Sequence, residues 1–359
     1  MRAKLIVNLM RQNLANELLS VLKEYKALGI AEQIDYQKFY LYSIITHSTA
    51  IEGSTVTEIE AQLLFDEGIT SSKRTMIEQI MNLDLKAAYE YGMQWIKRHE
   101  PVTVDSLITL ASIVMARTGS EYHSMGGDFS AAKGELRKLN VTAGIDGESY
   151  MSYQKVPAKL AAFCEELNKR RKMINHSDIC AVYDLSFWAH YQLVTIHPWT
   201  DGNGRTSRLL MNLLQMEYNV LPSKVLKEDK SKYIKALKDS REIEDVDVFG
   251  NCMAELHINH LKEDIDQYIK STNEEVVDKQ DLQKEMVGKW SIKPSLARKL
   301  LDILVFVADI DVITTDIIVR HFGFNATTTK RYLRQLTEFG YLAAYGGNKN
   351  RTYKVIRKD

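Results

Sequence analysis

The sequence predicts a mainly helical protein that contains one small β-hairpin and ends in a separate module of helices and strands. Apolar residues recur at i, i+3 and i+4 spacing over long stretches, for example residues 74–98 and 160–174, as in amphipathic helices. The chain has only 5 prolines in 359 residues, so few positions interrupt these helices. Its apolar content of 45% and charged content of 26% are typical of soluble globular proteins.

The predicted elements divide the chain into four parts. Helices fill residues 1–100, and Pro101 is expected to open the next helix. Two strand-capable runs flank Gly144 and Gly147, which predicts a hairpin between helical segments. Helices resume at Pro157 and restart after Gly204. The expected domains are an N-terminal helical region (1–100), a core (101–270), a polar, partly helical linker (271–290) and a C-terminal domain (291–359).

Composition argues against several classes of protein. The formal net charge is zero, so no global field favours nucleic acid or a membrane. No uncharged run is long enough to span a bilayer, and the N-terminus lacks the pattern of a signal peptide. The three cysteines are widely spaced and fit neither a disulfide framework nor a zinc site. We therefore expect a cytoplasmic protein with reduced thiols and no membrane partner.

The stretch "TIHPWTDGNGRTSRLLMNLL" (195–214) combines a glycine-containing turn with the start of a helix. A helix N-terminus offers free amide groups and a positive dipole, which suit a phosphate, and Gly202 and Gly204 allow close approach. Arg205 and Arg208 lie three residues apart on one helix face, so both can reach one polyphosphate. The stretch predicts a polyphosphate site.

Two further side chains give this site a chemistry. Asp201 would repel phosphate by itself, and its presence is explained if it holds a divalent cation such as Mg²⁺. His197 is the natural general base, because an unperturbed imidazole titrates near neutral pH. Other histidines are less suggestive. His257 and His260 share a helix face without a third metal ligand, so we expect a half-exposed polar face, and His190 is expected to be a satisfied helix histidine.

This string resembles the signature of the Fic (filamentation induced by cAMP) family, His-Pro-Phe-x-Asp/Glu-Gly-Asn-Gly-Arg, often followed by Thr-Gly-Arg. Trp199 replaces the usual Phe and Ser207 the common Gly. The resemblance implies a helical Fic-type core that transfers AMP from ATP to a Ser, Thr or Tyr hydroxyl of a target protein, with Mg²⁺ or Mn²⁺. The implied catalytic base is His197 and the implied metal ligand is Asp201. The implied phosphate ligands are Gly202, Asn203, Gly204, Arg205 and Arg208.

A second motif lies far upstream, in "THSTAIEGSTVTEIEA" (46–61). Here Glu52 falls in the last turn of a predicted helix, where an acid opposes the helix dipole, so a cation is expected to hold it. Gly53 is the predicted C-cap. Ser48, Glu52 and Gly53 resemble the Fic inhibitory motif, which implies that Glu52 pairs with Arg208 and makes ATP bind unproductively. In some relatives this glutamate also supports removal of AMP, and both directions stay open.

Two other segments resemble parts of the same family. The predicted hairpin at residues 138–156 corresponds to the flap that pairs with the target by strand addition, and the "GELR" of Gly134 to Arg137 precedes it. "KYIKALKDS" (232–240) resembles the Tyr-x-x-Ala-Leu helix, which places Tyr233 in the adenine pocket. An ordinary surface ribbon and a plain core tyrosine are the alternatives for these two features.

The C-terminal 70 residues differ in charge from the rest. Residues 290–359 hold 12 Lys or Arg against 6 Asp or Glu, a net charge of +6, and the remainder carries −6. A helix at 295–308, a short helix ending at Gly323, a longer helix capped by Asn325 and a hairpin resemble a winged helix-turn-helix. Protein contact is the alternative to DNA binding. The residues predicted to face DNA are Lys330, Arg331, Arg334, Lys349 and Arg351.

Two functions follow from these predictions. The first is an autoinhibited protein adenylyltransferase with ATP and a target protein as partners. The second is a DNA-binding transcriptional regulator whose core senses a nucleotide. Because some Fic relatives move phosphate, phosphocholine or UMP, the donor base is not determined. A homodimer is compatible with the chain, whose oligomeric state the sequence leaves open.

Overall fold

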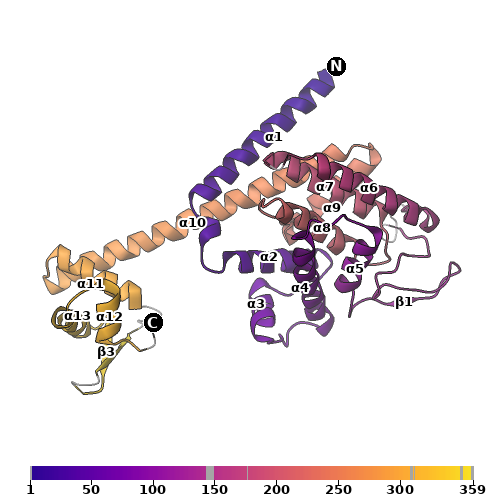
Figure 1. Cartoon of the computed structure of the whole chain (residues 1–359). Helices are drawn as coiled ribbons and strands as arrows, with labels where there is room; N and C mark the ends of the chain where they lie inside the picture. The colour runs from indigo at the N-terminus through magenta and orange to yellow at the C-terminus, as the bar shows by residue number, and fades with distance from the viewer. Residues whose placement is uncertain are drawn as a thin grey trace. The chain divides into compact units, whose positions relative to one another are not determined.

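The computed structural model is mainly helical and carries two small antiparallel hairpins, as the sequence predicts (Figure 1). It describes residues 2–142, 149–175, 177–307, 310, 312–347 and 351–356, with the backbone alone for 2–11 and 273–281. Compactness divides the chain into two units, residues 1–265 and 266–359. Among the described residues, no helix combines the length and apolar character needed to cross a membrane.

The first unit is built mainly from helices, with a longer, mostly non-helical segment between α5 and α6 (Figure 1). Its elements in chain order are α1 (Arg2–Ala27), η1 (Ile30–Glu32), α2 (Tyr36–Ile51), α3 (Glu58–Glu67), α4 (Met76–Ile96), α5 (Val104–Val114), β1 (Glu121–Tyr122), β2 (Phe129–Ser130), η2 (Tyr153–Lys155), α6 (Val156–Met173), α7 (Ile179–Ile196), α8 (Asn203–Glu217), η3 (Lys227–Asp229), α9 (Lys230–Glu242) and the start of α10 (Val246–Trp290). Pro101 lies just before α5, which begins at Val104.

Local sequence sets several of these helix starts. Thr57, Thr75 and Thr103 each accept a hydrogen bond from the backbone amide three residues later, in reciprocal capping boxes at the starts of α3, α4 and α5. Each cap is worth about 1 kcal/mol. Helix α2 ends at Ile51, with Glu52 as its C-cap, and Thr57 caps the start of α3. Only four residues, 53–56, therefore connect Glu52 to the cap of the next helix.

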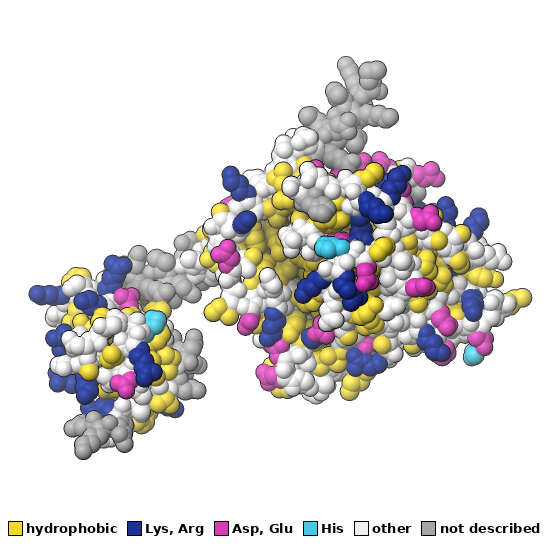
Figure 2. Space-filling model, in the orientation of Figure 1, with side chains coloured by type: hydrophobic (Ala, Val, Ile, Leu, Met, Phe, Trp, Pro, Cys, Tyr) yellow, Lys and Arg dark blue, Asp and Glu magenta, His cyan; other side chains and the backbone are white. Residues whose placement is uncertain are grey.

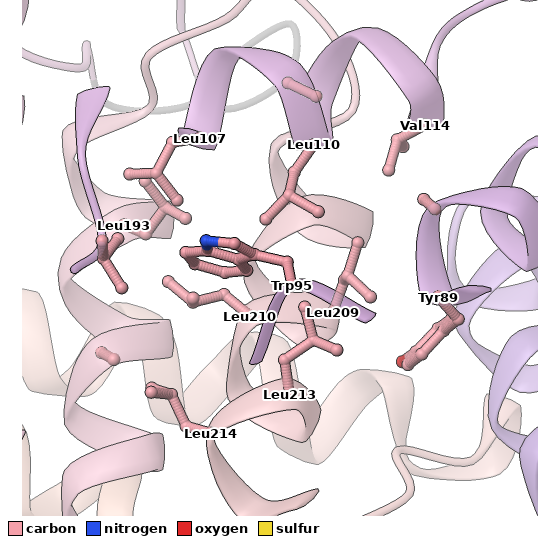
Figure 3. Close-up of a cluster of buried hydrophobic side chains, with 14 of the residues drawn as sticks. Tyr89, Trp95, Leu107, Leu110, Val114, Leu193, Leu209, Leu210, Leu213 and Leu214 are labelled. Atoms are coloured by element: carbon pink, nitrogen blue, oxygen red, sulfur yellow. The ribbon is translucent and has the colours of Figure 1, made fainter. Parts of the chain in front are cut away.

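The hydrophobic core lies between α4, α5, α7 and α8. In Figure 3 the Trp95 ring of α4 lies among Leu107 and Leu110 of α5 and Leu210 of α8. Helix α8 is the central element, because every side chain from Arg205 to Gln215 is buried. Truncating one such leucine to alanine typically costs about 2–5 kcal/mol. The helix that starts at the predicted phosphate site is therefore held rigidly.

The expectation of a half-exposed face at His257 and His260 was wrong. Both are buried, at 1% and 4% exposure. His257 Nε2 lies 2.9 Å from the Tyr183 hydroxyl, and His260 Nε2 lies 2.6 Å from the Asp229 carboxylate. These partners come from α7 and η3, so only packing between distant segments satisfies the two imidazoles.

The predicted hairpin at 138–156 takes a different form in the structure. Thr142 and Ser149 form one antiparallel bridge, and residues 143–148 lie outside the described part. The paired strands of this region come earlier, at β1 and β2, where Glu121 faces Ser130. Alternation of strand-forming residues located an extended segment correctly, but it missed the short hairpin that precedes it.

The second unit has the predicted order of elements. Its helices are α11 (Pro294–Val307), α12 (Thr315–Phe322) and α13 (Ala326–Glu338), followed by strands β3 (Leu342–Tyr345) and β4 (Thr352–Val355). Gly323 and Asn325 cap α12 and α13 as expected. Ile313 adds a bridge to Tyr353 beside the hairpin. The segment 271–290, predicted as a partly helical linker, is part of the continuous helix α10.

Candidate active site

His197 ends helix α7 in the left-handed conformation, with φ 52° and ψ 62°. Its amide donates to the carbonyl of Leu193 at 3.1 Å, and Pro198 then prevents the helix from continuing. A non-glycine residue with positive φ carries backbone strain and recurs at functional sites. The turn therefore places the imidazole at the mouth of the loop that leads into α8.

The imidazole has a defined tautomer and is held neutral. Nδ1 lies 3.3 Å from the carbonyl of Val194, which can only accept, so Nδ1 carries the proton and the Nε2 lone pair is left for a substrate. Burial lowers the pKa of His197 to about 4, and the charges of Arg137 and Arg241 act in the same direction. The neutral form, which is the form a general base needs, is populated at physiological pH.

Arg137 ties this loop to the segment around the Thr142–Ser149 bridge. Its side chain is 1% exposed, and its guanidinium donates to three backbone carbonyls, those of His197 (2.8 Å), Leu139 (2.8 Å) and Met151 (2.6 Å). Its own amide donates to Pro198 O at 2.9 Å. A planar guanidinium can satisfy several carbonyls at once, so Arg137 fixes their relative positions.

Asn203 closes the loop onto Trp199. Its Oδ1 accepts from the Trp199 amide at 3.1 Å and its Nδ2 donates to the Trp199 carbonyl at 2.8 Å. The indole of Trp199 is buried and donates to Gly134 O at 2.8 Å, so it anchors the loop. The Asn203 side chain, predicted as a phosphate ligand, is thus engaged in shaping the loop.

The N-terminus of α8 lies where the sequence predicts an anion site. Gly202 has φ 81° and caps the helix, and a Cβ there would lie 2.8 Å from the sulfur of Met115. The first amides of α8 have no intrahelical acceptor, so they face the space above Gly204. Asp201 stands beside them with a side chain 58% exposed, and its Oδ1 accepts from Arg205 Nη2 at 3.2 Å.

Arg205 is buried below this helix start. Its Nη2 contacts Met115 Sδ at 3.1 Å as well as Asp201. Its Nε and Nη1 are buried and have no hydrogen-bond partner among the described residues. Buried donors of this kind usually have a partner, so the guanidinium retains capacity for an anionic ligand.

Arg208 lies three residues further on and is held by the end of α2. Its Nε donates to Ser48 Oγ at 2.8 Å, and its Nη2 donates to Ser48 O at 2.9 Å and to Glu52 Oε1 at 2.6 Å. The guanidinium is 3% exposed. The structure thus brings Ser48 and Glu52 to the second arginine of the motif, as the resemblance implied.

Glu52 occupies the space over the helix start. It is the C-cap of α2, and Gly53 follows with φ 106°. A Cβ added at Gly204 would collide with Glu52 Oε1, so the carboxylate lies where an anion would meet the α8 amides. Burial alone would raise the pKa of Glu52, but the charge and hydrogen bond of Arg208 outweigh it and hold the pKa below its usual value.

Tyr233 lies in the buried part of the first unit. It is 1% exposed, its hydroxyl lies 3.0 Å from His190 Nε2, and Arg208 Nη1 donates to it at 3.4 Å. Its ring is in edge contact with Phe249. Tyr233 is thus a buried tyrosine in contact with Arg208, and its place in an adenine pocket stays a prediction.

The predicted DNA-facing residues lie in the second unit. Lys330, Arg331 and Arg334 are exposed on α13, and Arg351 is exposed beside β4. Lys349 lies outside the described residues. The residues of this set belong to a unit whose position relative to the first is not determined.

Sequence reasoning did not assign a role to Arg137, Tyr150 or Arg241. Tyr150 stacks on the His197 imidazole, and Arg241 lies over the Tyr150 ring. The "GELR" motif was the only signal near Arg137. Nothing in the local sequence marks Tyr150 or Arg241, because their contacts depend on how α9 and the segment after Ser149 pack against α7.

Known proteins are similar to part of this chain. Residues 101–215 match the model of the Fic/DOC family. The protein adenylyltransferase Fic of Drosophila melanogaster is 28% identical over 206 residues, which cover 55% of this chain and 37% of the fly protein. Protein adenylyltransferase fic-1 of Caenorhabditis briggsae is 26% identical over 204 residues, covering 56% and 36%. The chain thus spans little more than a third of the length of these curated relatives.

Solved structures are similar to this chain in fold. A Fic family protein from Desulfovibrio desulfuricans G20 has a TM-score of 0.61 at 17% identity and covers 98% of this chain and 97% of its own. Fic-1 of C. elegans (residues 134–508) has a TM-score of 0.59 at 21% identity, covering 75% and 76%. Residues 101–215 of the chain therefore match the Fic/DOC family, and the chain is similar in fold to solved Fic proteins.

Proposed function

We propose that this protein is an autoinhibited adenylyltransferase that transfers AMP from ATP to a Ser, Thr or Tyr hydroxyl of a target protein. The observation that carries the proposal is the position of Glu52. Its carboxylate bonds Arg208 at 2.6 Å and covers Gly204 at the start of α8. The Glu52 carboxylate thus occupies the proposed anion site at the start of α8, close to the proposed base His197.

The transfer needs a base, and His197 supplies it. Its Nε2 takes the proton from the target hydroxyl as the oxygen bonds the α-phosphorus of ATP and pyrophosphate leaves. Nδ1 keeps its proton in the hydrogen bond to Val194 O, so Nε2 is the nitrogen that is available as the base. The carbonyl bonds of Arg137 hold the backbone beneath the ring, which keeps the base in one position.

The residues at the start of α8 fit a nucleoside triphosphate with a divalent cation. The free amides from Asn203 to Arg205, the unpartnered nitrogens of Arg205 and the guanidinium of Arg208 form the phosphate cradle. The largely exposed carboxylate of Asp201 is the one placed to hold Mg²⁺ or Mn²⁺. Such a cation neutralises charge on the phosphates.

Inhibition follows from competition for Arg208. A γ-phosphate and the Glu52 carboxylate both require its guanidinium, and both require the space over Gly204. While Glu52 holds this position, ATP has to bind with its distal phosphate displaced, away from the geometry for in-line attack. Release of the end of α2 restores the site.

Transfer of label from [α-³²P]ATP tests the proposal. The full chain, Glu52→Gly and His197→Ala are incubated with Mg²⁺ and a bacterial lysate, and labelled protein is counted. The expected order is weak labelling, strong labelling and none. Competition with unlabelled GTP, CTP and UTP then identifies the preferred base. Absence of label on any protein, including Glu52→Gly itself, would refute the transferase assignment.

We propose that the same site also removes AMP. A glutamate beside the α8 cradle is placed to orient a water molecule toward a bound AMP-ester. A target labelled by Glu52→Gly protein and then purified should lose label to the wild-type chain, and should keep it with Glu52→Gly. Equal loss with both proteins would assign hydrolysis to another residue.

A second function is favoured by the C-terminal unit, which we interpret as a winged helix-turn-helix that binds DNA. Lys330, Arg331 and Arg334 are exposed along α13, and Figure 2 shows Lys and Arg side chains gathered on one side of this unit. A mobility shift on the chain's own promoter DNA tests it. Arg331→Ala with Arg334→Ala should abolish the shift and leave labelling by the Fic site unchanged, whereas an unaffected shift would exclude α13 as the DNA contact.

A further inference from the structure

The ring of Tyr150 lies flat against the imidazole of His197. The ring centroids are 3.8 Å apart and the planes differ by 17°. Tyr150 follows the Thr142–Ser149 bridge, and its amide donates to Val141 O at 3.0 Å. The guanidinium carbon of Arg241 lies 4.9 Å from the Tyr150 ring centroid, a cation–π contact that restrains the ring.

One side chain sets the separation of the two stacked residues. Arg137 donates to the carbonyl of His197 and to the carbonyl of Met151, the residue after Tyr150. Both bonds come from the same buried planar group, at 2.8 Å and 2.6 Å. The backbones that carry the two rings are therefore held at a fixed spacing by a common donor.

The imidazole needs such a partner. Its hydrogen bond to Val194 O is long, at 3.3 Å, so it indicates which nitrogen carries the proton but restrains the ring only weakly. Rotation of a histidine ring about its last side-chain bond is broad when only one weak contact restrains it. A stacked aromatic ring restricts that rotation and covers one face of the imidazole.

We propose that Tyr150 is a positioning residue for the base: its ring fixes the plane of the His197 imidazole and keeps water from one face, so Nε2 points toward the acceptor hydroxyl. The catalytic meaning of this contact rests on the proposed transferase function, but the contact itself does not. The phenyl ring suffices, because the contacts of Tyr150 with His197 and Arg241 among the described residues are made by its ring.

The charges that face His197 come from three other elements. Arg137 precedes the bridge segment, Arg241 belongs to α9, and Glu52 ends α2. The two arginines oppose protonation of the imidazole and Glu52 favours it, while burial has the largest effect. Removal of the Tyr150 ring leaves these charges in place and admits water to the imidazole. The change in the pKa of His197 therefore measures the contribution of the stacked ring.

The test measures the titration of His197 by NMR in full-length protein labelled with ¹³C-histidine, with His197→Gln used to assign the signal. Tyr150→Ala and Tyr150→Ser remove the ring, and Tyr150→Phe retains it. Tyr122→Ala is the matched control, because it removes a tyrosine stacked on Phe129 in the β1–β2 hairpin. Thermal melts check that each variant is folded. We expect the Tyr150 variants to fold, because Tyr150 is only half-buried.

The two truncations should raise the midpoint of His197 by about one pH unit or more, since they restore solvation of the charged form. Tyr150→Phe and Tyr122→Ala should keep the wild-type midpoint. In the Glu52→Gly background, Tyr150→Ala should slow labelling about tenfold and Tyr150→Phe should restore it. An unchanged midpoint in both truncations overturns the proposal. If Glu52→Gly transfers no label while the midpoints separate, the transferase assignment fails and the positioning role stands.

Discussion

Replacement of Glu52 gives the sharpest test of the inhibitory contact. Glu52 accepts from Arg208 at 2.6 Å, and its side chain is 32% exposed. Hydrogen bonds to charged groups contribute about 1.5–3 kcal/mol, and partial exposure places this pair at the lower end, about 1.5–2 kcal/mol. Removing the pair should therefore raise the population with a free Arg208 about 10- to 30-fold.

Two substitutions separate charge from occupancy. Glu52→Gly removes both and should increase the initial labelling rate by that full factor. Glu52→Gln keeps a neutral acceptor over Gly204 and loses the charge, so its rate should lie between wild type and Glu52→Gly. The assay is the initial rate of label transfer from [α-³²P]ATP at saturating Mg²⁺.

Glu58→Gln is the matched control. Glu58 lies six residues further along the chain and accepts from Ser43 at 2.5 Å and His47 at 3.1 Å, with no contact to Arg208. Its substitution should leave the labelling rate at the wild-type value. Equal rates for Glu52→Gly and Glu58→Gln would refute the reasoning, because the pair with Arg208 would then not limit transfer.

Further predictions concern pH, stability and metal. Because the pKa of His197 lies at about 4, labelling by Glu52→Gly protein should be equal at pH 7.5 and 6 and fall only toward pH 4; a midpoint near 6.5 would contradict a buried neutral base. Burial also lowers the pKa of His257 to about 3, so below pH 6.5 the unfolded chain takes up a proton that the folded chain refuses. The free energy of unfolding in urea should fall as the pH drops from 6.5 toward 3, and His257→Gln should flatten that slope. Arg137→Ala should lower the free energy of unfolding by about 3 kcal/mol, because three backbone carbonyls lose their donor. The control is Arg170→Ala, which removes an exposed ion pair with Glu166 and should lower the free energy of unfolding by less than about 1 kcal/mol in the same urea titration. Asp201→Asn should raise the Mg²⁺ concentration for half-maximal labelling severalfold, and an unchanged Mg²⁺ dependence would remove Asp201 from the metal site.

The helical fold could be predicted from the sequence because its signals are local. Apolar spacing, threonine caps and proline positions act within a few residues, and the starts of α3, α11, α12 and α13 agree with them. Errors occurred where partners are distant. His257 and His260 are buried because Tyr183 and Asp229 satisfy them, and no local pattern encodes those partners. Tyr233 likewise meets Arg208 and His190 only through tertiary packing, and its role in nucleotide binding stays a prediction.

The sequence by itself determined the local chemistry of residues 197–208. A histidine before a proline, a glycine turn and a helix start lie within twelve residues, so the sequence alone predicts a base close to the free amides of a helix start. Only the tertiary structure decided which groups meet that site. Glu52 and Arg208 are 156 residues apart, and their contact exists because α2 packs beside α8. Tyr150 and Arg137 also contact His197 only because distant segments pack together. The free energy of that packing comes from the whole core, so no single sequence motif predicts these contacts.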